Sequence, residues 1–191
     1  MDLTYALLLA ALAAGAIWAL VRLSIGTRIY LSARGQRIVV CPETEQHAAV
    51  QLDALDAAAQ ATAHAPDFRL KSCSRWPEKQ DCGQECLAQI EVAPFDCLVS
   101  TIINRWYTDK QCVFCQKPFG ELHWHDHPPA LMNQKRETIP WKEIPSEKLP
   151  EVLATHWPVC WSCHIAETFR KEHPELVIDR RPDPRRLTIY H

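Results

Sequence analysis

The hydrophobic pattern separates the start of the chain from the rest. Residues 3–21 carry no charged side chain and read LTYALLLAALAAGAIWALV. As a helix rising 1.5 Å per residue, this run is just long enough to span a hydrocarbon core of ~30 Å. The chain begins Met1-Asp2, without the basic segment that opens a cleaved signal peptide. We therefore expect an uncleaved transmembrane helix within residues 1–25, which anchors the protein in the lipid bilayer.

Positive charge follows this apolar run and predicts how the helix is oriented. Basic residues next to a membrane span stay on the cytoplasmic side. The pattern predicts a single-pass membrane protein with a basic juxtamembrane linker at residues 26–37 and a cytoplasmic soluble part. Thiols in the cytosol stay reduced, so this orientation favours metal binding over disulfides. The charges concerned are Arg22, Arg28, Arg34 and Arg37.

Residues 38–109 alternate between strand and helix patterns. A short β-branched run is followed by a turn and a return strand, which predicts a hairpin. Spacings of three and four between apolar residues then predict helices. We interpret the segment as a hairpin plus a helical, Cys-rich subdomain. The expected strands are 38–43 and 48–53, and the expected helices are 54–65, 81–91 and one beginning at Asp96 and ending near Trp106.

Residues 110–178 form the second predicted subdomain. A turn-rich segment, 111–120, precedes residues 121–127, which alternate like a strand. Residues 128–158 are rich in proline and predict a long, mostly irregular excursion. A helix should begin near Cys160 and end before Pro174, and residues 179–191 form an exposed tail. The predicted fold class is α+β, with one transmembrane helix followed by a small, loop-rich domain held together by metal.

Composition narrows the function classes. The 191 residues include nine Cys and 14 Pro but only five Gly, and the formal net charge is −2. A nucleic-acid-binding protein normally has a clear excess of positive charge, so no nucleic-acid partner is expected. The sequence contains no nucleophilic triad signature, phosphate loop or dinucleotide fingerprint. These features favour a binding protein over an enzyme.

Two CxxC pairs provide the strongest chemical signal. Two residues between cysteines allow both sulfurs of a pair to reach one ion, and two pairs complete a tetrahedral zinc shell. The first pair lies in the turn-rich segment, and the second opens the predicted helix. This arrangement resembles treble-clef and zinc-ribbon-like domains, which implies structural Zn²⁺. The predicted ligands are Cys112, Cys115, Cys160 and Cys163.

The second pair also supports a different interpretation. Cys160-Trp-Ser-Cys163-His164 is a C-x-x-C-H string, the attachment signature of c-type haem. His164 would be the proximal iron ligand, and a distal ligand could come from the histidines at 123, 125 and 127. Haem is attached outside the cytoplasm, so the predicted orientation counts against this alternative.

Four further cysteines lie in the middle of the chain. They could hold a second zinc ion or a [4Fe–4S] cluster, form disulfides, or remain inert in the core. The pKa of the Cys97 thiol should be lowered at the first turn of a helix. Cys41 is either a spare thiol or a substitute ligand for Cys73 or Cys97. The four predicted members are Cys73, Cys82, Cys86 and Cys97.

Three histidines alternate within residues 121–127. On a strand, His123, His125 and His127 would share one face, where three imidazoles can bind a metal. Asp126 and Glu121 lie nearby in sequence. This segment is therefore a further candidate metal site.

Three strings carry a wider resemblance: LKSCSRWP at 70–77, DCGQECL at 81–87 and HWHDH at 123–127. On these the chain resembles uncharacterised bacterial membrane-anchored proteins with a Cys-rich domain, a resemblance that implies no activity. The favoured hypothesis is a zinc-binding assembly module that recruits a protein partner at the membrane. The alternatives are electron transfer through haem or an iron–sulfur cluster, and thiol-based redox sensing or metal handling.

Overall fold

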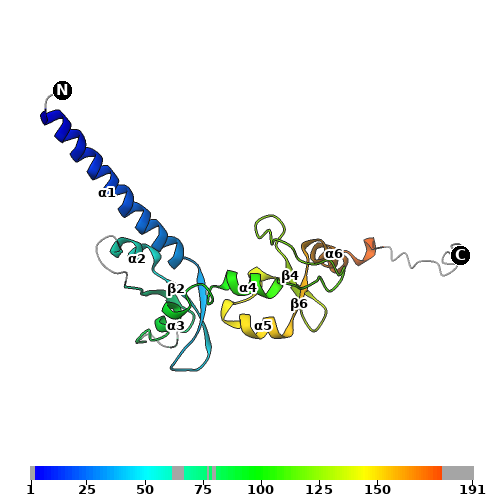
Figure 1. The fold of residues 1–191 in the computed structure, drawn as a ribbon. Coiled ribbons are helices and arrows are strands. Elements are labelled where there is room, and N and C mark those ends of the chain that lie inside the picture. The colour runs from blue at the N-terminus through cyan, green and yellow to red at the C-terminus, as the bar shows by residue number, and fades with distance from the viewer. Residues whose placement is uncertain (1–2, 62–66, 77, 79–80, 178–191) are drawn as a thin grey trace. The chain divides into compact units, whose positions relative to one another are not determined.

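The computed structural model describes residues 3–61, 67–76, 78 and 81–177 (Figure 1). The chain forms two compact units. Unit 1 comprises Met1–Trp106 and Pro145–Glu151, and unit 2 comprises Tyr107–Ile144 and Val152–His191. Helices and sheets are present in both, consistent with the predicted α+β class. The tail predicted at 179–191 lies outside the described residues.

Unit 1 begins with a long apolar helix, α1 (Leu3–Ala33). Its segment Leu7–Ala33 reaches a mean hydropathy of 2.0 and has no buried residue in its most apolar window. The helix is therefore long and apolar enough to cross a membrane. It also continues through the basic segment, where the Arg22 guanidinium lies 5.0 Å from the ring centroid of Trp18. Residues 26–33 of the predicted linker are thus helical.

An antiparallel sheet follows α1, with strand order β1-β2-β3. β1 (Gln36–Val40) and β2 (His47–Leu52) form the predicted hairpin, and β3 (Leu70–Cys73) pairs with β2. The sheet contributes most of the buried side chains of the unit 1 core. That core contains Ala33, Val39, Ala48, Val50, Leu52, Ala54, Leu70, Cys86 and Ile90.

Arg37, which the sequence placed in the basic juxtamembrane linker, is buried. Its guanidinium donates hydrogen bonds to the carbonyls of Ser32, Ala33 (2.7 Å) and Gly35 (3.1 Å). Burial lowers the pKa of Arg37, and the neighbouring Cys97 thiol opposes that shift. A cation at the end of a helix satisfies carbonyls that have no partner within the helix. Arg37 therefore ties the end of α1 to the first strand.

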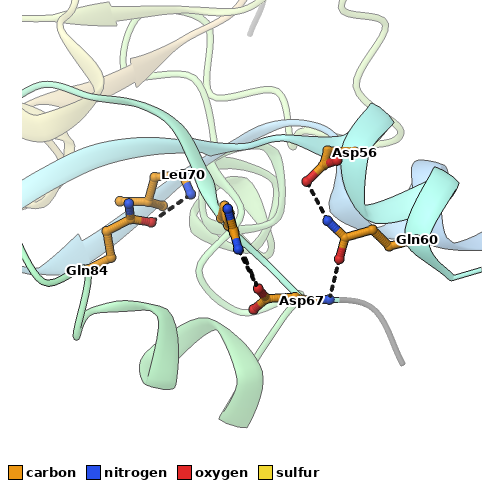
Figure 2. A network of polar contacts seen from close by, with 6 residues as sticks. Asp56, Gln60, Asp67, Leu70 and Gln84 are labelled. Carbon is orange, nitrogen blue, oxygen red and sulfur yellow. Dashed lines mark hydrogen bonds and ion pairs between the residues drawn. The ribbon is translucent and has the colours of Figure 1, made fainter. Parts of the chain in front are cut away.

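The short helices of the Cys-rich segment differ from their predicted bounds. They are α2 (Ala54–Gln60), α3 (Leu87–Val92) and α4 (Val99–Tyr107). The predicted helix over 81–91 is wrong in its first half, because Gln84 adopts a left-handed φ of 56° and helix begins only at Leu87. Figure 2 shows the end of α2, where the Gln60 side chain donates to Asp56 (2.7 Å) and accepts from the Asp67 amide (3.4 Å).

Unit 2 contains a second antiparallel sheet, ordered β5-β4-β6. Its strands are β4 (Ala130–Met132), β5 (Thr138–Pro140) and β6 (Trp157–Val159). The prediction of a mostly irregular excursion over 128–158 is therefore wrong. Each strand has only three residues, too few for a recognisable period, and the sheet exists because both outer strands pair with β4.

Short helices complete the second half of the chain. Within the segment 128–158, η1 belongs to unit 2, η2 to unit 1, and α5 crosses the boundary between the two units. The predicted helix beside Cys160 is confirmed as α6, which ends before Pro174. The helices are η1 (Trp141–Glu143), η2 (Ser146–Lys148), α5 (Leu149–Thr155), α6 (Trp161–Glu172) and η3 (Pro174–Leu176).

Tyr107 holds the interior of unit 2 together. Only 1% of its surface is exposed, and its ring centroid lies 4.6 Å from that of Phe119. The hydroxyl donates to the Ala130 carbonyl (2.8 Å) and accepts from Nε1 of Trp141 (3.0 Å). Burial raises the pKa of Tyr107 well above its ordinary value, while the Trp141 hydrogen bond opposes the shift. One buried hydroxyl thus connects the central strand to η1.

Candidate metal centre

The first CxxC pair lies on a tight turn. The Cys112 amide donates to the Lys117 carbonyl (2.9 Å), and the Gln116 amide donates to the Cys112 carbonyl (2.8 Å). Gln116 adopts a left-handed φ of 58°, which reverses the chain directly after Cys115. An isolated bridge between Gln111 and Pro118 closes the turn. Both sulfurs therefore come from one rigid loop, which we call the Cys112 knuckle (residues 112–117).

The second pair lies where β6 passes into α6. Cys160 is the N-cap residue, with extended backbone, and Cys163 lies in the first turn of the helix. The Val113 amide donates to the Pro158 carbonyl (3.0 Å), which fastens the Cys112 knuckle to β6. The Cys160 amide then donates to Sγ of Cys112 (3.3 Å). Strand pairing and these hydrogen bonds bring the two pairs together.

All four sulfurs meet at one point. Their ligand atoms lie within 4.8 Å of one another, and Sγ of Cys115 is 3.7 Å from Sγ of Cys160. A tetrahedral ion with metal–sulfur bonds of about 2.3 Å requires sulfurs about 3.8 Å apart. The donor set and its spacing therefore suit one thiolate-bound ion. We refer to this group as the thiol cluster: Cys112, Cys115, Cys160 and Cys163.

The thiols of the cluster differ in acidity. Burial acts to raise the pKa of Cys112, but hydrogen bonds from the amides of Cys115, Cys160 and Phe114 outweigh it and lower the value to about 7. Burial raises the pKa of both Cys160 and Cys163, and contact with the other thiols raises that of Cys163 further. The Cys112 thiol is thus prepared to ionise, whereas those of Cys160 and Cys163 are not. A bound cation would stabilise all four as thiolates.

His164 lies beside the thiol cluster, on α6. Its Nδ1 is 2.9 Å from Oγ1 of Thr138, and burial lowers its pKa. Its ring centroid lies 6.3 Å from that of Trp161. The imidazole is therefore oriented by β5. The cysteines of the C-x-x-C-H string share their site with the first pair.

The predicted strand over 121–127 is wrong. The segment forms turns, and the His127 amide donates to the His123 carbonyl (3.0 Å). All three histidines are exposed, and the thiol cluster is the one group of potential ligands that meets at a common point among the described residues. The histidines alternate with other residues in a turn and not in a strand. The three imidazoles therefore do not share the face of a strand.

The middle cysteines lie on different elements of unit 1. Cys73 ends β3, Cys82 lies in a loop and Cys86 precedes α3. Cys97 also packs against the unit 1 core and lies beside β1, where its carbonyl accepts from the Ile38 amide (2.8 Å). The predicted low pKa of Cys97 is wrong, because burial raises it more strongly than the Arg37 charge lowers it.

Comparisons with protein-family models, with curated proteins and with solved structures found no match. The function must therefore be inferred from the site and its surroundings.

Proposed function

We propose that this is a membrane-anchored zinc-binding protein in which one zinc ion stabilises a binding module. The observation that carries the proposal is the convergence of the four cluster sulfurs within 4.8 Å. One small buried cluster of unit 2 is built from Cys112, Ala130, Met132 and Val159. Such a core gains much of its stability from a structural metal.

The same spacing favours zinc over the alternatives. An iron–sulfur cluster places several iron and sulfide atoms between its cysteine ligands, which spreads the ligand sulfurs apart. A c-type haem would need the second pair for its thioether bonds and would leave the first pair idle, although the two pairs share one site. The geometry suits a single ion, and zinc is the ion most often held by four thiolates in structural sites.

We also propose that unit 2 is a treble-clef domain. The Cys112 knuckle, the β4–β5 hairpin and the helix α6 follow one another in the order of that domain. The second cysteine pair lies at the N-terminus of α6, where the helix dipole favours thiolates. Along the sequence, η1, η2, α5 and β6 occupy the interval between the hairpin and this helix.

The proposed role is to recruit a protein partner at the membrane, with α1 in the bilayer and the soluble part in the cytoplasm. A cavity of about 570 Å³ in unit 2 supports a binding function. Trp residues are favoured where interfaces are strongest, because they bury a large surface. The cavity is lined by Trp124, Trp141, Trp161, several prolines and His164.

Metal analysis tests the zinc proposal. The full chain is purified in detergent from bacteria that can mature c-type haem, and metals and visible absorption are measured. We expect zinc without stoichiometric iron and no visible band. Cys115→Ser should remove one zinc ion per chain, because three thiolates bind far more weakly than four. Cys97→Ser, a matched change outside the thiol cluster, should keep the wild-type content. Iron with a haem spectrum, or equal zinc in both variants, would contradict the proposal.

A further inference from the structure

A second loop in the chain repeats the backbone of the Cys112 knuckle. The Cys41 amide donates to the Gln46 carbonyl (2.8 Å), and the Glu45 amide donates to the Cys41 carbonyl (2.8 Å). Glu45 has a left-handed φ of 55°. The Cys112 knuckle has the same two hydrogen bonds at the same sequence offsets, with a φ of 58° at the matching position. Residues 41–46, the Cys41 knuckle, therefore share the backbone form of the Cys112 knuckle.

The surroundings of the two sulfurs also correspond. In both knuckles the amides two and three residues after the first cysteine lower its pKa. At Cys41 the largest influence is the Thr44 side chain, followed by burial, which opposes it, and then by the amides of Glu43 and Thr44. Thr44 occupies the position that Cys115 has in the other knuckle. The Cys41 knuckle thus presents one thiol to a metal instead of two.

We propose that Cys41, Cys73, Cys82 and Cys86 form a second thiolate site for zinc, in unit 1. The set replaces one member of the group that sequence spacing suggested: Cys41 takes the place of Cys97. Four cysteines from separate elements would fasten the hairpin, the end of β3 and the start of α3 to one ion. The site is separate from the thiol cluster of unit 2 and does not depend on it.

Hydrogen bonds bring these four elements together. The Gln89 side chain donates to the Val40 carbonyl (2.6 Å) and accepts from the Val40 amide (3.0 Å), so α3 is held beside the residue that precedes Cys41. The Gln84 side chain accepts from the Leu70 amide (3.0 Å), which fastens the Cys82 loop to β3 (Figure 2). The Gln84 amide donates to Sγ of Cys82 (3.3 Å), as amides do to thiolate ligands.

Cys86 lies at the centre of the group. It is 6% exposed and belongs to the unit 1 core, against which Cys41, Cys73 and Cys97 pack. Burial raises the pKa of Cys86 to about 11, and the nearby thiols of Cys73, Cys82 and Cys41 raise it further. Among the described residues, only the thiol cluster of unit 2 has its sulfurs within 4.8 Å of one another. Ion binding would therefore draw the turn cysteines Cys41 and Cys82 toward Cys86.

Cys97 has different partners. Its Sγ lies 3.6 Å from the Pro94 carbonyl, and the Arg37 charge and hydrogen bond act on its thiol. Its backbone carbonyl is fixed by the Ile38 amide at the side of β1. The buried guanidinium of Arg37 would repel a metal cation at this position. Cys97 is therefore the natural control for a test of Cys41.

The test compares Cys41→Ser with Cys97→Ser in the full chain, purified in detergent under reducing conditions. We expect two zinc ions per chain in the wild type, one in Cys41→Ser and two in Cys97→Ser. Exchange of zinc for ¹¹³Cd²⁺ should give two cadmium resonances typical of four-thiolate sites. Cys41→Ser should lose one resonance and leave the other at its position, which shows that unit 2 still folds.

Other outcomes distinguish this site from the thiol cluster. One zinc ion in the wild type, lost in Cys115→Ser but kept in Cys41→Ser, would overturn the second site and leave the proposed function intact. Loss of an ion in Cys97→Ser instead of Cys41→Ser would overturn the assignment of Cys41. Two ions in Cys41→Ser would do the same. Cys82 is a proposed ligand outside the buried core. Loss of one zinc ion and one cadmium resonance in Cys82→Ser as well would support the four-cysteine site.

Discussion

At the scale of single residues, removal of the Tyr107 hydroxyl tests the stability of unit 2. It bonds to the buried Ala130 carbonyl and to Nε1 of Trp141. Tyr107→Phe deprives both groups of this partner while leaving the ring against Phe119. Each such loss in a buried site costs about 1–3 kcal/mol. We expect the urea midpoint of the zinc-loaded protein to fall without a change in slope.

Tyr30→Phe provides the matched control for this change. Tyr30 lies on α1 and is exposed, so loss of its hydroxyl should leave the midpoint unchanged. Equal midpoints for Tyr107→Phe and Tyr30→Phe would show that the buried hydroxyl contributes no net stability.

Single residues also show which features could be predicted from the sequence and which could not. Both CxxC pairs were identified as one site because two residues between cysteines suffice to place two sulfurs on one ion. Cys41 gave no such signal, because Thr44 stands where a second cysteine would complete the spacing. Arg37 was assigned to the basic juxtamembrane linker by its sequence position, and its burial against the end of α1 was not predicted. Its partners are backbone carbonyls, which every residue has, so the sequence does not show which of them Arg37 contacts.

At the scale of elements, local patterns were predicted and long-range pairings were not. The apolar run, the hairpin and the helix that begins beside Cys160 each follow from neighbouring residues. The sheet of unit 2 was missed because β4 and β6 are three residues long and separated by 24 residues of sequence. Alternation over 121–127 predicted a strand, but the segment forms turns, and the His127 amide donates to the His123 carbonyl.

The thiol cluster should determine whether the elements of unit 2 stay folded. Cys112 belongs to the core of this unit, and the cluster joins the Cys112 knuckle to the start of α6. Cys160→Ser removes one ligand and with it most of the zinc affinity. We expect faster hydrogen exchange in β4, β6 and α6, measured by mass spectrometry, and unchanged exchange in β1, β2 and β3.

Cys97→Ser is again the reference for this measurement, since it alters a thiol outside the cluster. Unchanged exchange in α6 after zinc loss would mean that the apolar core of unit 2 is sufficient without metal. Faster exchange throughout both units would mean that they unfold together rather than separately.

At the scale of the whole molecule, α1 is long and apolar enough to cross a membrane. Its apolar side chains are exposed along most of Leu7–Ala33, an arrangement that water disfavours and a bilayer stabilises. The proposed metal sites offset the small size of what remains. Anchor and metal would therefore have separate roles: the bilayer satisfies the helix, and the ions stabilise the short strands and loops.

The anchor is testable apart from the metal. We expect the full, unprocessed chain to stay in the membrane pellet after alkaline carbonate extraction. Leu12→Lys with Ile17→Lys places two charges on the apolar helix, each costing about 2.5–3.5 kcal/mol at the centre of a bilayer. This variant should appear in the soluble fraction with its zinc content unchanged. The control Leu12→Ile with Ile17→Leu should remain in the pellet.

The orientation of α1 in the membrane can be tested in the same cells. The exposed charges Arg28 and Arg34 follow the apolar run, and basic residues at that position are retained in the cytoplasm. Protease added to intact spheroplasts should therefore spare residues 38–191, and lysis should make them cleavable. Digestion before lysis would place the soluble part outside the cytoplasm. Cysteines there would meet oxidising conditions and the haem-attachment machinery. That outcome would weaken the zinc assignment and favour attachment of c-type haem at the C-x-x-C-H string.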